Sequence, residues 1–188
     1  MSDSFYQAFG IVTSAYARME SEIRMFIAGL VFSDDTTTAS VFLDSSQLRD
    51  NLNSLKKIGR QSDYEEEIKS LGVIPNQLRE TRNLFIHGIW SPNTFSEKGG
   101  YAFVRDLKTK FEHLPKGGKR WTTGESEQFR FEDFNAIHDQ IMEFLEESEI
   151  LRSTIEEENS DIQFCSLMGD WREFRESLGF SKLAMDRS

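Results

Sequence analysis

Residues 5–30 read FYQAFGIVTSAYARMESEIRMFIAGL, and large apolar residues recur in this stretch at intervals of three and four. This spacing places them on one face of an α-helix. The stripe consists of Phe5, Phe9, Val12, Tyr16, Met19, Ile23, Phe26 and Leu30. We therefore expect a helix of about 28 residues, roughly 40 Å long. It should end near Ser33-Asp34-Asp35 and form the spine of a helical bundle.

Residues 134–155 carry a second stripe with the same spacing. Its members are Phe134, Ile137, Ile141, Phe144, Ser148, Leu151 and Ile155. Two long stripes of this kind suit helices that pack at a shallow angle, either in a closed bundle or as two coiled-coil arms. Shorter helices are expected at residues 45–58 and 63–71 and from Pro75 to about Trp90, and they favour the closed bundle.

Residues 99–131 differ in character. Tyr101–Val104, Lys119–Thr123 and Gln128–Phe131 have the composition of strands, and Gly and Pro separate them. The predicted fold class is therefore all-α: an up-down bundle of four to six helices with a β-hairpin or small meander inserted before the last long helix. Residues 1–160 would form this domain. Residues 161–188 would add a C-terminal helical appendage and tail.

Composition narrows the class of protein. The single cysteine, Cys165, cannot form an internal disulfide, which favours a reducing, cytoplasmic location. No stretch approaches the roughly 20 apolar residues that cross a bilayer, so no membrane partner is expected. With three His and one Cys, no spacing indicates a zinc site, and no cofactor is expected.

The net charge of −10 argues against general binding of nucleic acid. Basic residues nevertheless gather between Lys98 and Arg120. This basic ribbon either contacts RNA locally or is a solvated hairpin without a ligand. Its candidate RNA-binding residues are Lys108, Lys110, Lys116, Lys119 and Arg120.

Residues 81–90, TRNLFIHGIW, carry the chemistry. Asn83 and His87 are four residues apart and share a helix face, whereas Arg82 and His87 lie about 140° apart around the axis. A straight helix therefore does not direct Arg82 and His87 to one point. The long Arg side chain, a kink or a second copy of the chain could supply the convergence. Gly88 would leave room beside the imidazole for a ligand or another backbone.

These residue types suit RNA cleavage without a metal. Histidine titrates near neutral pH, so His87 can remove the proton of the ribose 2′-OH or protonate the leaving oxygen. The forked guanidinium of Arg82 can stabilise the negative charge that builds on the phosphate. Asn83 can orient the imidazole or bind the phosphate.

Arg82-Asn83-x-x-x-His87 resembles the signature of the HEPN superfamily, in which Arg, often followed by Asn, precedes His by a gap of four to six residues. The resemblance implies a helical bundle that dimerises through its motif helices, with catalytic Arg82, Asn83 and His87 in a cleft between subunits. Many members are metal-independent endoribonucleases of toxin–antitoxin, phage-defence or RNA-processing systems. The implied partners are a second copy of the chain, RNA, and an antitoxin or nucleotidyltransferase. The alternative is an inactive interaction or transcription-regulatory module.

Overall fold

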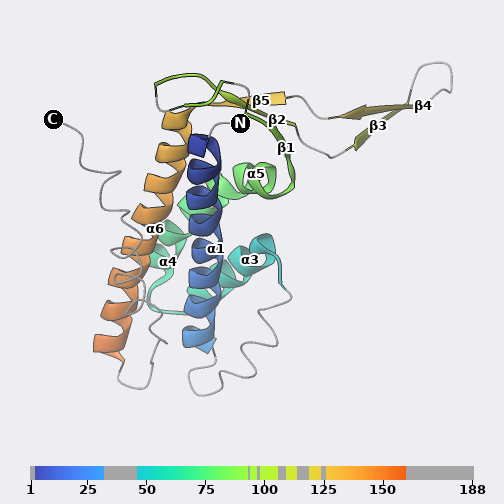
Figure 1. Cartoon of the computed structure of the whole chain (residues 1–188). Coiled ribbons are helices and arrows are strands. Elements are labelled where there is room, and N and C mark those ends of the chain that lie inside the picture. Colours follow the sequence, from blue (N-terminus) through green and yellow to red (C-terminus); the bar gives the residue numbers. More distant parts are fainter. Residues whose placement is uncertain are drawn as a thin grey trace.

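The computed structural model describes residues 3–31, 46–92, 94–96, 98–105, 109–113, 119–123 and 126–159. These residues are mostly helical, as the sequence predicts, and a small antiparallel sheet joins the helices. The two long helices are α1 (Asp3–Val31) and α6 (Phe131–Glu158), and they lie side by side (Figure 1). The expected C-terminal helix over residues 161–188 and Cys165 lie outside the described residues.

The two long helices run in the same direction. Phe5 near the start of α1 contacts Phe134 near the start of α6, with ring centroids 6.0 Å apart. Farther along both helices, Ser148 donates a hydrogen bond to Glu22 (2.8 Å). The order of these contacts along each helix requires parallel axes, as Figure 1 shows.

A buried ion pair sets the register of this interface. The Glu22 carboxylate is 5% exposed and lies 3.1 Å from the Nε atom of Arg152, which is 6% exposed. Burial of either charge alone would be costly, so sliding one helix along the other is disfavoured. The polar Ser148 in the second stripe is thereby explained, because it hydrogen-bonds to the same carboxylate.

Within the described residues, three shorter helices accompany the two long ones: α3 (Leu48–Gly59), α4 (Glu65–Leu71) and α5 (Val73–His87). Each buries apolar side chains in the common core, including Leu55, Ile68 and Phe85. The helices expected at residues 45–58 and 63–71 are thus confirmed as α3 and α4, with shorter N-terminal ends.

The strands form two small antiparallel sheets, where the sequence predicts one hairpin or small meander. β1 (Ile89–Ser91), β2 (Ala102–Arg105) and β5 (Ser126–Phe129) form an antiparallel sheet in the order β1-β2-β5. β3 (Thr109–His113) and β4 (Lys119–Thr123) form a separate two-stranded sheet, which extends away from the helices (Figure 1).

Two predicted boundaries are wrong. The helix expected to reach Trp90 ends at His87, and residues 89–91 pair with β2 instead. The last strand ends at Phe129, and Phe131 is already the first residue of α6. The Asp133 carboxylate explains this early start, since it accepts a hydrogen bond from the Arg130 backbone N–H at 2.6 Å and so caps the helix.

An aromatic cluster joins the end of α5 to the sheet and to both long helices. Phe85 lies at its centre. Its ring centroid is 5.8 Å from that of Phe9, 4.9 Å from that of Trp90 and 5.1 Å from that of Phe134. Phe85 is 1% exposed, so its packing holds the end of α5 in a defined position.

Candidate functional site

The residues of the Arg82-Asn83-x-x-x-His87 motif occupy the last two turns of α5. Phe85 faces the core from the same turns, and Trp90 packs behind it and donates a hydrogen bond to the Phe85 carbonyl at 3.4 Å. Trp90 therefore packs in the core rather than offering an open face for a base. The motif side chains are displayed on a helix end that the aromatic cluster anchors.

Arg82 is bound within its own chain. Its Nε atom donates a hydrogen bond to a carboxylate oxygen of Glu20 on α1, and its Nη1 atom donates to the Asn83 side-chain oxygen at 3.3 Å. The side chains of Arg82 and Glu20 are 23% and 12% exposed. The guanidinium thus has two fixed partners at the edge of the core, while its Nη2 atom has none among the described residues.

Glu20 lies between two arginines. Its other carboxylate oxygen is 3.8 Å from the Nη2 atom of Arg24, one helical turn farther along α1. Sequence reasoning missed Glu20. The available signal was an acidic residue directly beside Met19 in the apolar stripe, at the boundary of the buried face. Such a residue can balance a cation from a neighbouring helix.

Tyr16 lies beneath this charged group. Its ring contacts Phe85 (centroids 5.7 Å apart), and its buried hydroxyl has no hydrogen-bond partner among the described residues. Burial raises the pKa of the Tyr16 hydroxyl well above its ordinary value, and the positive charge of Arg82 opposes this shift only in part. Tyr16 therefore remains a neutral phenol beside the guanidinium.

His87 has a different environment. It is the last residue of α5 and is exposed, and within the described residues no hydrogen bond or ion pair is made by its imidazole. The hydrogen bond next to it involves backbone atoms alone: the Gly88 N–H donates to the Leu84 carbonyl at 2.8 Å. The imidazole is thus accessible to a ligand from solvent.

The expected space at Gly88 is filled. A Cβ atom placed there would lie 2.3 Å from Val104 Cγ2 and 2.5 Å from the Leu84 carbonyl oxygen. The expected approach of another segment at Gly88 is therefore made by β2 of the same chain, and β2 leaves no room for a ligand at that position. The glycine lets the sheet pack directly against the end of α5.

The structure does not bring the side chains of Arg82 and His87 together. Because α5 is one continuous helix through both residues, they remain about 140° apart around its axis. Within the described residues neither Arg82 nor Asn83 makes a hydrogen bond to the imidazole. One chain therefore presents the Arg82 guanidinium and the His87 imidazole separately.

Of the basic ribbon, Lys110 lies on β3, and Lys119 and Arg120 lie on β4. In the backbone register, Arg120 pairs with Glu112. Lys108 and Lys116 lie outside the described residues. The ribbon therefore follows the two-stranded sheet that extends from the helices.

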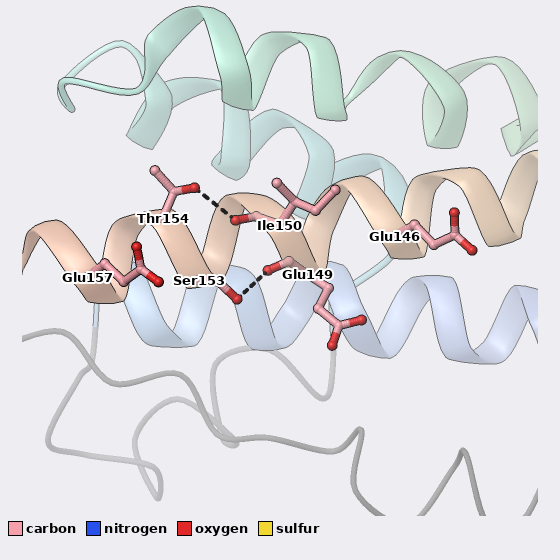
Figure 2. Close-up of a pocket in the computed structure, with 6 residues that line it drawn as sticks. All are labelled: Glu146, Glu149, Ile150, Ser153, Thr154 and Glu157. Atoms are coloured by element: carbon pink, nitrogen blue, oxygen red, sulfur yellow. Dashed lines mark hydrogen bonds between the residues drawn. The ribbon is translucent and has the colours of Figure 1, made fainter.

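A surface depression of about 480 Å³ lies elsewhere, along the second half of α6 (Figure 2). Its lining residues are Glu146, Glu149, Ile150, Ser153, Thr154 and Glu157. The two hydroxyls are hydrogen-bonded to carbonyl oxygens of the same helix, both at 3.0 Å. With three carboxylates and no cation, this depression would repel a phosphate, so it does not compete with the motif as an RNA site.

In the part of the chain that the structure describes, no group of three or more His, Cys, Asp or Glu side chains is arranged to hold a metal ion. None of the described helices is long and apolar enough to cross a membrane. No protein-family model, curated protein or solved structure matches the chain.

Proposed function

We propose that this chain is a metal-independent endoribonuclease of the HEPN type that acts in the cytoplasm as a homodimer. The single observation that carries the proposal is the position of His87. It is an exposed imidazole without a partner in the described part of the chain, placed at the end of a rigidly packed helix that also carries Arg82 and Asn83. In this proposal the helices form a HEPN-type bundle.

The dimer is part of the proposal because one chain keeps Arg82 and His87 apart. The surface near His87 also favours self-association. Ile86 flanks this end of α5 and is 44% exposed, while Val73 at the other end is 48% exposed. Pairing two α5 helices would cover these apolar side chains. It would also bring Arg82 of one subunit toward His87 of its partner.

In the proposed reaction, the ribose 2′-oxygen attacks the adjacent phosphorus while the bond to the 5′-oxygen breaks. The products are a 2′,3′-cyclic phosphate and a free 5′-hydroxyl. The His87 imidazole carries out one of the two proton transfers, either taking the proton of the 2′-OH or protonating the leaving 5′-oxygen, and a water molecule carries out the other. The unpartnered Nη2 atom of Arg82 donates to a phosphate oxygen as negative charge develops. Glu20 is a positioning residue, since it holds the guanidinium by Nε.

The test is cleavage of labelled RNA by the purified full-length chain in EDTA. Wild-type protein should cut, and His87→Ala should lose cleavage while keeping its helical circular dichroism and its elution volume. His138→Ala is the matched control, because His138 is a half-buried histidine on α6, outside the motif. Equal cleavage by His87→Ala, or loss of wild-type cleavage in EDTA, contradicts the proposal.

The second candidate is a non-catalytic interaction or transcription-regulatory module. The Glu20–Arg82 ion pair favours this second candidate, because it engages the guanidinium of the motif within the fold. This candidate predicts that the purified chain cuts neither structured nor unstructured RNA but binds one specific protein partner. Cleavage that depends on His87 excludes it.

A further inference from the structure

The β1-β2-β5 sheet has one face that is not covered by the core. The backbone register places Ile89 opposite Arg105 and Ser91 opposite Phe103, so these side chains share a face. Trp90, Ala102 and Val104 point to the other face, toward the aromatic cluster. We call the first set the outer face. Its members are Ile89, Ser91, Tyr101, Phe103, Arg105, Ser126 and Gln128.

Each side chain of the outer face is exposed or half-buried. Tyr101 is 38% exposed, and its ring packs edge-on against that of Phe103 (centroids 5.0 Å apart, planes at 79°). Beside them, the Arg105 Nε atom donates to the Ser126 hydroxyl at 3.4 Å, which holds the guanidinium on the sheet. Two aromatic rings and an oriented arginine thus lie next to one another.

The charge of the outer face differs from that of the whole chain. The chain has a net charge of −10, yet none of the seven side chains is acidic and Arg105 is positive. The chain continues from β2 and β5 into β3 and β4, which carry the three basic residues Lys110, Lys119 and Arg120 and one acidic residue, Glu112. The outer face therefore does not repel a polyanion such as RNA, whereas a surface with the average charge of this acidic chain would.

The outer face also begins beside the proposed catalytic residue. Ile89 follows His87 by two residues, which is at most about 7 Å between their Cα atoms. Val104 contacts Gly88, so β2 is packed directly against this turn. The first residue of the outer face and the proposed catalytic residue are thus close neighbours on the same turn.

We infer that the outer face is a binding platform for unpaired nucleotides, and that the RNA cut at His87 is single-stranded. This inference rests on the proposed function. Unpaired bases can stack on Tyr101 and Phe103, while Arg105 binds a phosphate or stacks on a base and Gln128 contacts a base edge. Bases inside a double helix are stacked on one another and cannot reach these rings.

The experiment measures binding rather than cleavage, so that it is independent of catalysis. Full-length protein with His87→Ala is titrated with a fluorescent unstructured RNA oligonucleotide and with the same sequence in a duplex. The unstructured RNA should bind at least about tenfold more tightly. A combined Tyr101→Ala and Arg105→Ala variant should bind the unstructured RNA at least about tenfold more weakly, which corresponds to about 1.4 kcal/mol, near the low end for one stacked base.

The matched control combines Tyr6→Ala and Arg49→Ala, which remove an exposed tyrosine from α1 and an exposed arginine from α3. This control should leave affinity for RNA unchanged. Equal affinity of the outer-face variant and the control overturns the inference, as does duplex that binds as tightly as unstructured RNA. A changed elution volume of the outer-face variant, with unchanged RNA affinity, would assign the face to contacts between copies and also overturn it.

The two proposals fail in distinguishable ways. If wild-type protein binds unstructured RNA through the outer face but never cuts it, the role of His87 is wrong and the platform stands. If the outer-face variant cuts RNA with unchanged KM and kcat, the platform is wrong and the catalytic proposal stands.

Discussion

Arg82 on α5 and Glu20 on α1 form an ion pair across 62 residues of sequence, and this pair ties the motif helix to the longest helix of the fold. Asn83 completes the arrangement by accepting a second hydrogen bond from the same guanidinium. The pair gives Arg82 a fixed direction. It also leaves His87, one turn farther along, without an intrachain partner among the described residues.

Replacing Glu20 by Gln should destabilise the fold. The substitution removes the charge that balances a guanidinium only 23% exposed, so the free energy of unfolding should fall by about 1.5–3 kcal/mol. Urea unfolding measures this loss. The control is Glu66→Gln, which breaks the exposed pair with Lys69 and should cost less than about 0.5 kcal/mol. Equal effects would mean that the Glu20–Arg82 pair contributes no more than a surface pair.

Mixing two inactive variants should restore activity. Arg82→Ala and His87→Ala each remove one half of a site shared between subunits. A heterodimer of the two variants retains one complete site, so an equal mixture that has exchanged subunits should reach about a quarter of wild-type activity if dimers form at random. The measurement is RNA cleavage after the subunits are mixed and allowed to exchange. A mixture as inactive as its components would show that Arg82 and His87 act within one chain or not at all.

Replacing Gly88 by Ala should destabilise the fold. The added Cβ would meet Val104 Cγ2 at 2.3 Å and the Leu84 carbonyl oxygen at 2.5 Å, so both the Val104 side chain and the end of α5 must shift. The expected loss is about 1–3 kcal/mol of unfolding free energy. Gly10→Ala is the control, because nothing lies within 4 Å of its added Cβ on α1. It should raise stability by about 0.5–1 kcal/mol, and a loss at Gly10 equal to that at Gly88 would argue against the close contact.

Replacing Tyr16 by Phe should stabilise the protein and reduce its sensitivity to alkali. The buried hydroxyl has no partner in the described structure, so its removal should add about 1 kcal/mol near pH 7. Burial raises the pKa of Tyr16 in the folded state, so the folded state retains this proton after the unfolded chain has released it. Tyr16 therefore adds no pH dependence to folding below the unfolded value of about 10, and it lowers the stability of the fold progressively as the pH rises above that value.

Urea unfolding at pH 8, 10 and 11 tests the Tyr16 prediction. The wild type should lose stability more steeply above pH 10 than Tyr16→Phe. Tyr6→Phe changes an exposed tyrosine and should follow the wild-type curve. If Tyr16→Phe is less stable than the wild type at pH 7, the hydroxyl makes a stabilising hydrogen bond.

The long helices could be predicted because their signal is local. An apolar residue every three or four positions produces a buried face whatever the rest of the fold does, so the stripes at residues 5–30 and 134–155 predicted α1 and α6 closely. The motif on residues 82–87 could be located in the same way. Its helical position and the angle between Arg82 and His87 follow from the periodicity of the backbone alone.

Other features depended on residues far apart in the sequence. The segment Ile89–Ser91 continues the apolar pattern of α5, yet it is a strand because Trp90 packs on Phe85 and β2 supplies backbone hydrogen bonds. The partner of Arg82 could not be predicted from the sequence either, since any of 32 acidic residues could have balanced its charge. The outer face could not be predicted because it depends on the register of three strands that are separate in the sequence.

The sequence by itself therefore determined the long helices and the location of the Arg82-Asn83-x-x-x-His87 motif. Only the tertiary structure decided that Glu20 holds Arg82, that His87 is exposed and that Gly88 packs against Val104. The physical reason is the range of the interactions. Helical periodicity acts over three or four residues, whereas ion pairs, strand pairing and burial depend on which distant segments the packed core brings together.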